Sequence, residues 1–155
     1  MKNILFATSN LIPSENKWNY VLSITQSSKA SLTIMHVMGA TTPLLNAVDG
    51  ALERNHGIEF PKRKEEYHKQ EEKRLQDFID KHKPKDKEYQ LINIVGLVKV
   101  GKVVDTILSE ERKGKYDLLI LGTKPVNSLI ARILGSVSMM VKNKSLTPVY
   151  LAQPN

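Results

Sequence analysis

Five short apolar segments, separated by stretches with helical periodicity, constrain the fold of this chain more than any other feature. They are expected to form strands over residues 4–7, 31–37, 89–100, 117–122 and 148–152. Segments this short, with few charges, are typical of strands that are buried on both faces of a sheet. Because a helical stretch follows each of the first four segments, the order predicts a parallel sheet covered by helices on both faces.

The helical stretches begin and end at residues suited to those positions. Ser14 is a suitable N-cap for the first helix. Gly101 and Gly114 bound the third helix, and a fourth is predicted over residues 132–143. Residues 38–60 contain several Gly and Pro without a sustained period, so they are predicted to form a long loop.

The second helical stretch, from Pro61 to Pro84, is rich in Lys and Glu. Its apolar face is narrow, so we expect most of the helix to be solvated, including the neighbouring side chains His68, Glu71 and Glu72. His36 lies in an apolar strand and is expected to be a core or rim histidine with its hydrogen bonds satisfied. The four histidines share no metal-ligand spacing and the chain has no cysteine, so no metal site is predicted.

Composition predicts one ordinary globular domain over residues 1–155. The chain is 41% hydrophobic and 25% charged, which is neither disordered nor fibrous in character. Without cysteine, a disulfide scaffold and cysteine catalysis are excluded. The start of the chain turns polar too soon for a signal peptide, and no apolar run reaches the roughly 20 residues of a membrane span. We therefore expect a cytoplasmic protein that does not enter a membrane.

The net charge of +7 is unevenly distributed. No acidic residue follows Asp117, while Lys124, Arg132, Lys142 and Lys144 do. Such a positive segment can attract a phosphate-bearing partner, or it can serve solubility alone. Nucleic acid is a poorer fit as partner, because no basic cluster is interleaved with aromatic residues.

The carboxyl ends of the strands are where an open parallel sheet binds ligands. This rule selects residues 8–10, residues 37–39, Gly101 and the segment that starts at Gly122. In that last segment a polar loop follows the strand, and a Gly135-Ser136 pair is expected near the start of the next helix, where free N–H groups favour a phosphate. The alternative is that both glycines serve turning and close packing only. The segment fits neither the P-loop nor the dinucleotide fingerprint, and no nucleophile elbow or acid–base constellation is present, so no catalytic residue is predicted.

Residues 122–138 resemble the motif of the universal stress protein family. That motif has a glycine, two residues, a second glycine, nine residues, and then glycine followed by serine or threonine. Gly122 matches the first glycine and Gly135-Ser136 match the last pair, with Val137-Ser138 also typical of the family. The order of the other elements agrees over essentially the whole chain, although only this segment is specific.

The resemblance implies a doubly wound sheet of five parallel strands in the order 3-2-1-4-5, of the adenine-nucleotide alpha-hydrolase type. It also implies a regulatory stress-response protein that binds ATP or AMP, with or without Mg²⁺, and hydrolyses ATP at most weakly. The resemblance further implies a homodimer that pairs through the last strand, because this strand lies at a sheet edge that needs covering. A regulatory protein partner is also expected, but the sequence does not identify it. The residues expected at the nucleotide are Thr8, Ser9, Val37, Gly122, Thr123, Lys124, Asn127, Ser128, Gly135, Ser136, Val137 and Ser138.

Two positions depart from the family pattern. Pro125 stands where the middle glycine of the motif is expected, and proline offers no N–H to a phosphate. Ser9 stands where nucleotide-binding members commonly carry an aspartate, so a charged acceptor is missing. Both departures favour the alternative function, a dimeric protein-interaction module that binds no nucleotide.

Overall fold

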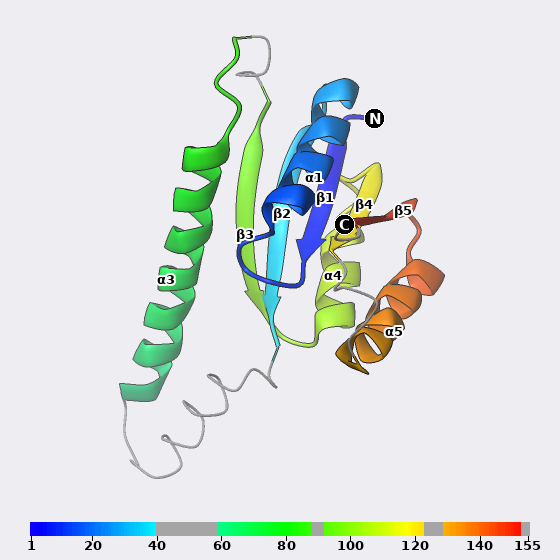
Figure 1. The fold of residues 1–155 in the computed structure, drawn as a ribbon. Helices are drawn as coiled ribbons and strands as arrows, with labels where there is room; N and C mark the ends of the chain where they lie inside the picture. The colour runs from blue at the N-terminus through cyan, green and yellow to red at the C-terminus, as the bar shows by residue number, and fades with distance from the viewer. Residues whose placement is uncertain (40–58, 88–91, 123–128, 153–155) are drawn as a thin grey trace.

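The computed structural model of the protein describes residues 1–39, 59–87, 92–122 and 129–152. Within these ranges the chain forms one open sheet with helices on both faces (Figure 1). The loop predicted at residues 38–60 lies almost entirely outside the described residues, as do residues 89–91 of the third predicted strand. The side chains of residues 59–63 and 129–136 are likewise outside the described part.

The sheet has the predicted parallel topology, with strands in the order β3-β2-β1-β4-β5. The strands are β1 (Asn3–Thr8), β2 (Ser31–Met38), β3 (Ile94–Val100), β4 (Leu118–Gly122) and β5 (Val149–Ala152). The chain winds from β1 toward β3 and then returns to the other side of β1. The direction of winding therefore changes between β1 and β4, and this switch point is where such folds bind ligands.

Helices α1 (Glu15–Ser28) and α3 (Glu59–His82) cover one face of the sheet. Trp18 of α1 and Phe78 of α3 meet edge to face there, with ring centroids 5.2 Å apart. Helices α4 (Val103–Glu111) and α5 (Leu129–Lys144) pack on the opposite face, against side chains that include Leu5 and Leu119. No helix within the described ranges is long and apolar enough to cross a membrane.

Two elements begin three or more residues away from their predicted starts. Helix α5 begins at Leu129, three residues before the predicted start, because Leu129 and Ile130 continue the apolar spacing of Ile133. Strand β3 begins at Ile94, although the apolar alternation starts earlier. The carbonyl of Asn93 still accepts the N–H of Leu32 at 2.8 Å, so pairing with β2 begins one residue before the strand.

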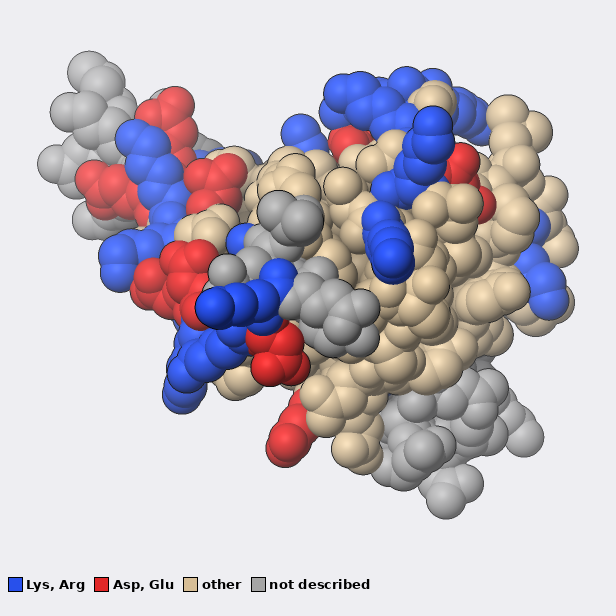
Figure 2. Space-filling view, turned by 90° about the horizontal axis from the view of Figure 1, so that it is seen from above, with Lys and Arg blue, Asp and Glu red and all other residues tan. Residues whose placement is uncertain are grey.

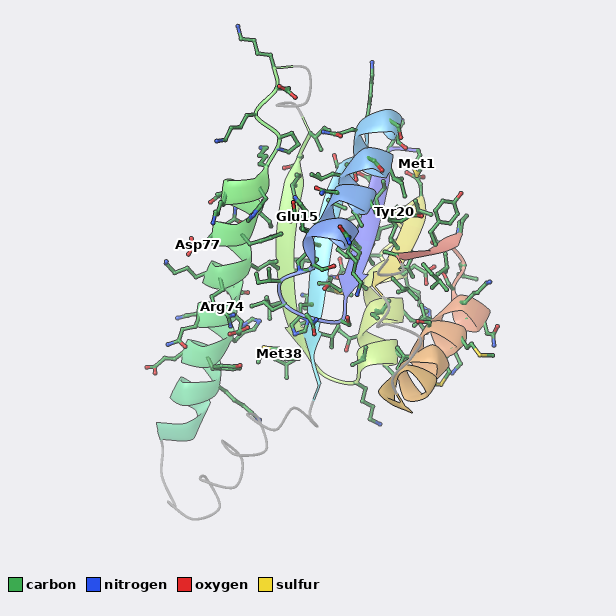
Figure 3. All side chains as sticks on the ribbon, in the orientation of Figure 1. Met1, Glu15, Tyr20, Met38, Arg74 and Asp77 are labelled. Carbon is green, nitrogen blue, oxygen red and sulfur yellow. The ribbon has the colours of Figure 1, made fainter. Side chains whose placement is uncertain are left out.

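The charged helix α3 has the predicted narrow apolar face, with Leu75 and Ile79 buried. Asp77 points away from the sheet (Figure 3), and its side chain is 63% exposed. The prediction is wrong for Glu71, which is only 6% exposed. Its carboxylate lies 2.8 Å from the Arg74 guanidinium, and such a pair allows a charged group to be buried.

Asp117 fixes the amino ends of β1 and β4 to each other. Its carboxylate accepts the backbone N–H groups of Lys2 at 2.7 Å and Asn3 at 2.9 Å. The Asp117 N–H in turn donates to the Asn3 carbonyl at 2.8 Å. The two hydrogen bonds from the backbone favour the ionised carboxylate and lower the pKa of Asp117.

Glu111 holds the turn that leads from α5 into β5. Its Oε1 atom accepts hydrogen bonds from the N–H groups of Leu146 at 2.9 Å and Thr147 at 2.8 Å, and from the hydroxyl of Ser145 at 2.5 Å. Burial opposes ionisation of this carboxyl, but the hydrogen bonds from Ser145, Thr147 and Leu146 outweigh it and lower the pKa of Glu111. Glu111 therefore positions the edge strand through charge-assisted hydrogen bonds.

His36 lies near the carboxyl end of β2, on the face of the sheet that α1 and α3 cover. Its Nδ1 atom lies 3.2 Å from the carbonyl oxygen of Thr8, so the expected satisfied histidine is confirmed. Burial lowers the pKa of His36, and the Thr8 carbonyl and the charge of Glu71 only partly offset that effect. The folded protein therefore prefers the neutral imidazole.

We expect Glu111→Gln to lower the free energy of unfolding at pH 7 by about 1 kcal/mol, because the charge-assisted part of three hydrogen bonds is lost. The folded pKa of Glu111 is lowered, so its contribution is present above the unfolded pKa of about 4.5 and is lost as pH falls through the folded value. Urea unfolding should show the gap between wild type and variant closing below pH 4.5. Glu66→Gln, on the exposed side of α3, is the matched control and should show no gap; a gap that persists unchanged in acid contradicts the assignment.

We expect His36→Gln to flatten the dependence of stability on pH between 7 and 5. Because the folded pKa of His36 lies below 6.5, the unfolded chain takes up the proton first, and wild-type stability falls as pH falls through that range. Glutamine carries no proton in this range and can still donate to the Thr8 carbonyl. Urea unfolding at several pH values measures the slope, and equal slopes for the two proteins would show that His36 does not cause it.

Candidate functional site

A pocket lies at the carboxyl ends of β1, β2 and β4, between the sheet and helices α4 and α5. It is at the switch point of the sheet and has a volume of about 120 Å³. The described residues that line it are Ala7, Thr8, Ser9, Met35, Val37, Val103, Ile107, Leu121, Gly122, Val137 and Ser138.

Strand register explains why residues far apart in the sequence meet here. Ala7 is the partner of Met35 on β2 and of Leu121 on β4, so three strands reach the pocket at the same level. Thr8 and Ser9 then follow at the end of β1, and Gly122 at the end of β4. Because the strands are parallel, their carboxyl ends fall at one edge, as the sequence predicted.

Six of the predicted site residues line this pocket: Thr8, Ser9, Val37, Gly122, Val137 and Ser138. Thr123, Lys124, Asn127 and Ser128 lie outside the described residues, as does Pro125. Gly135 and Ser136 belong to α5, but their side chains are outside the described part.

The expectation that Gly135 and Ser136 stand near the start of a helix is wrong. Helix α5 begins at Leu129, so Gly135 is in its second turn. Only the first four N–H groups of a helix, counted from its N-cap residue, lack a partner within it, and among the described residues of α5 these are the N–H groups of residues 129–131. A phosphate at this helix terminus would therefore meet N–H groups of the first turn, just after residues 123–128.

Helix α4 contributes two pocket residues that the sequence reasoning did not assign to the site, Val103 and Ile107. They are four residues apart and lie on one face of the helix. The position of Gly101 could have indicated these two residues. This glycine follows β3 at the same carboxyl edge of the sheet, and α4 begins directly after it.

The pocket wall is mainly apolar and buried, with Met35, Leu121 and Ile107 almost fully covered. Polar groups come from Thr8, Ser9 and Ser138. The Thr8 hydroxyl donates to the carbonyl of Asn10, whereas the hydroxyls of Ser9 and Ser138 have no hydrogen-bond partner among the described residues. An apolar slot with a few convergent hydroxyls is suited to binding a flat, mostly apolar group by its faces and edges.

The volume sets a limit on what this part of the site encloses. It is well below the roughly 300–1,000 Å³ of pockets that bury a whole drug-sized ligand. It is close to the cavity of about 150 Å³ that holds a benzene molecule. The described walls therefore enclose one ring-sized group, and the rest of a larger ligand would extend toward residues 123–128.

None of the described residues that line the pocket is titratable. No group of three or more His, Cys, Asp or Glu suited to hold a metal ion occurs within the described ranges either. These walls can bind and orient a ligand through packing and hydroxyl groups.

Gly122 is not required by packing or by backbone conformation. A Cβ atom built there would lie 3.5 Å from the Phe6 ring and 3.6 Å from the carbonyl oxygen of Ala7, which are ordinary contacts. The close-packing explanation that the sequence left open is therefore unsupported at this glycine. For Gly135, which lies in the part of α5 without described side chains, it stays open.

Comparison with solved structures shows the fold shared by this chain. The hypothetical protein MJ0577 has 17% identity and a TM-score of 0.66, with 99% of this chain and 96% of that chain covered. A universal stress protein family protein from Arabidopsis thaliana, solved with AMP bound, has 17% identity and a TM-score of 0.60 over 100% and 93% of the two chains. A universal stress protein in complex with cAMP has 17% identity and a TM-score of 0.59 over 99% and 98%.

No curated protein matches the sequence significantly. The model of the universal stress protein family, in contrast, matches residues 1–153, which is nearly the whole chain. This match agrees with the strand order, with the pocket at the switch point and with the motif that starts at Gly122. The chain belongs to the universal stress protein family.

Proposed function

We propose that this universal stress protein binds an adenine nucleotide, ATP or AMP, in the pocket at the carboxyl ends of β1, β2 and β4. The observation that carries the proposal is that six residues predicted for nucleotide contact, from three strands and α5, line one pocket. The protein would act by changing its partners when the nucleotide is bound, as a regulatory protein of the stress response.

The chemistry of the pocket suits the adenine end of such a ligand. Adenine is flat and apolar on its faces, and the walls formed by Val37 and Ile107 are apolar. Its polar edge and the ribose would meet the hydroxyls of Thr8 and Ser9. Phosphates would extend toward residues 122–128 and the first turn of α5, with the hydroxyls of Ser136 and Ser138 as further donors and with Mg²⁺ where a triphosphate is bound.

Two relatives support an adenine nucleotide over other ring-shaped ligands. One was solved with AMP bound and another in complex with cAMP, and both have this fold over nearly the whole chain. Residues 123–128 include Lys124, and no acidic residue follows Asp117, so this part of the chain is positively charged. A local positive field favours a phosphate-bearing ligand.

A second function, a dimeric interaction module that binds no nucleotide, is favoured by Pro125 and Ser9. Proline removes one N–H from the loop that would meet phosphates, and serine at position 9 cannot act as a charged acceptor. In either function we propose no catalytic role beyond slow, incidental ATP hydrolysis. The reason is that the described pocket walls offer no general base.

We further propose a homodimer paired through β5. This strand forms one edge of the sheet, and an uncovered edge offers unpaired backbone groups to another chain. Large apolar side chains are exposed on this strand and in the turn before it: Tyr150 is 51% exposed and Leu146 88%. Pairing two edges would bury these side chains as well as extend the sheet.

Nucleotide binding predicts a change in thermal unfolding with and without millimolar ATP, ADP or AMP in the presence of Mg²⁺. At about 100 times its dissociation constant a nucleotide stabilises by roughly 2.7 kcal/mol, or about 5 to 10 °C for a domain of this size. Val103→Trp should abolish the rise, because this half-exposed residue lies at the pocket and a large ring there fills it. Val100→Trp, at an exposed position outside the pocket, is the matched control and should keep the rise.

Gly122→Ala tests whether the chain still folds when the wall of the same pocket is changed. Because its Cβ atom meets only ordinary contacts, the melting temperature without ligand should stay close to wild type. If wild type shows no rise with any of the three nucleotides, nucleotide binding is rejected and the interaction module is the better account.

The proposed homodimer predicts the mass of the protein in solution, which sedimentation or light scattering measures. Wild type should have twice the 17.5 kDa of one chain. Tyr150→Asp should dissociate the dimer, because an exposed apolar side chain at the pairing edge becomes charged. Tyr20→Asp, which changes a similarly exposed tyrosine on α1, should leave the dimer intact. A wild-type protein found only as monomer contradicts the proposal.

A further inference from the structure

A second cavity, of about 660 Å³, lies at the opposite end of the sheet, on the face that α4 and α5 cover. It runs along β2 and β3 beside the end of α4 and the turn that follows. Its floor includes Thr33, Val95 and Leu97, and its rim includes Lys2, Lys99 and Lys115. We call it the lysine-rimmed groove.

The groove exists because, among the helices that the structure describes, only α3 packs on β3, and it covers one face of that strand. Ile94 and Val98 are buried on the side of α3, whereas Val95, Leu97 and Lys99 alternate with them and face the other way. In Figure 1 the helices α4 and α5 lie toward the β4 and β5 side of the sheet. Val95 is consequently 41% exposed, although it lies within a strand that pairs with β2.

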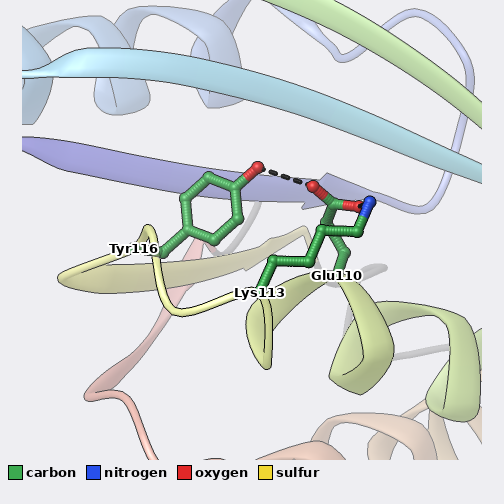
Figure 4. A network of polar contacts seen from close by, with 3 residues as sticks. All are labelled: Glu110, Lys113 and Tyr116. Carbon is green, nitrogen blue, oxygen red and sulfur yellow. Dashed lines mark hydrogen bonds and ion pairs between the residues drawn. The ribbon is translucent and has the colours of Figure 1, made fainter.

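The two acidic residues in the groove have their charges satisfied within the protein. Glu110 lies 2.6 Å from the Lys113 ammonium and accepts the Tyr116 hydroxyl at 2.8 Å (Figure 4). Asp117 accepts the two backbone N–H groups at the start of β1. Lys113 is therefore used within the protein as well.

The three rim lysines form no close pair of this kind, although Lys2 and Lys99 act electrostatically on Asp117 and Glu110 from a longer distance. Lys2, Lys99 and Lys115 form no ion pair with a carboxylate of the described residues. Basic side chains gather along one side of this end of the molecule, seen at the upper edge of Figure 2. The groove thus presents a half-exposed apolar strip between cationic groups whose charge is available to a partner.

We propose that the lysine-rimmed groove binds a segment of another protein in which apolar side chains alternate with carboxylates. The apolar residues would cover Val95 and Leu97, and the carboxylates would pair with Lys2, Lys99 and Lys115. Charge complementarity of this kind sets the choice of partner and the rate of association more than the final affinity.

Other occupants fit the groove less well. A second copy of this chain that docked through the same groove would bring the rim lysines of the two copies together, and these charges repel each other. A nucleic acid would bring phosphates toward Glu110 and Asp117, and the only described aromatic side chain in the groove, Tyr116, is half-buried and held by Glu110. Neither phosphates nor sugars would cover the apolar strip, whereas an amphipathic protein segment does.

The groove is independent of the proposed nucleotide site, because the two cavities share no described residue. The test uses the full chain and a fluorescein-labelled peptide of about ten residues in which glutamate and leucine alternate, titrated by fluorescence anisotropy. Wild type should bind the peptide saturably, and added salt should weaken binding. Replacing each glutamate of the peptide by glutamine should weaken it as well.

Matched variants decide whether the groove is responsible. The triple variant Lys2→Gln, Lys99→Gln and Lys115→Gln should weaken binding roughly tenfold, as expected for three surface ion pairs. The control triple Lys69→Gln, Lys81→Gln and Lys142→Gln removes the same charge from exposed lysines elsewhere and should bind like wild type. Val95→Asp, at an exposed position, should weaken binding by placing a carboxylate in the apolar strip.

Several results would overturn the proposal. One is a wild-type protein that does not bind the peptide. Another is an equal loss of affinity in the two triple variants, which would indicate net charge alone. A single-stranded oligonucleotide of about 20 nucleotides, or vesicles containing phosphatidylserine, could bind more tightly than the peptide and lose affinity only in the groove triple variant. That outcome would assign the groove to nucleic acid or to membranes instead.

Discussion

The central position of β1 is the constraint on which the rest of the structure depends. Ile4, Leu5 and Phe6 are fully buried, and their strand is hydrogen-bonded to β2 on one side and to β4 on the other. A strand that is covered on both faces and paired on both edges is apolar at its central positions, which is why residues 4–7 carry no polar side chain. Its two ends then decide what lies at each edge of the sheet: Asp117 fixes the amino end, and Thr8 and Ser9 enter the pocket at the carboxyl end.

Strand order and the location of the pocket could be predicted because they depend on short segments of the sequence. Apolar runs such as 117–122 identify strands without knowledge of their neighbours, and the rule for parallel sheets then brings Thr8, Val37 and Gly122 to one edge. The start of α5 was misplaced because Leu129 and Ile130 extend an apolar pattern that is also compatible with a loop. This matters for the site, since the earlier start puts Gly135 in the second turn and leaves the free N–H groups of the described helix at residues 129–131.

What the sequence could not predict depends on pairs of residues rather than on single segments. Glu71 looks like any solvated glutamate of α3, but Arg74 one turn later allows it to be buried. The pocket residue Val103 is recognisable only once Gly101 is known to turn α4 back over the sheet. The lysine-rimmed groove is harder still, because it arises where no described helix covers one face of β3 and where Glu110 pairs with Lys113 and Tyr116. Each of these depends on tertiary contacts that periodicity does not record.

The two cavities lie on the same face of the sheet and are connected by two elements. Along β2, Thr33 lines the groove, while Met35 and Val37 line the pocket two and four residues later. Helix α4 places Val103 and Ile107 against the pocket and Glu110 in the groove, and it is the only described helix that borders both. Met35 is fully buried in the central sheet, so β2 has little freedom to move. If occupancy of one cavity changes affinity at the other, α4 is the element that has to shift, because coupling between sites requires an element that both ligands contact and that has two arrangements.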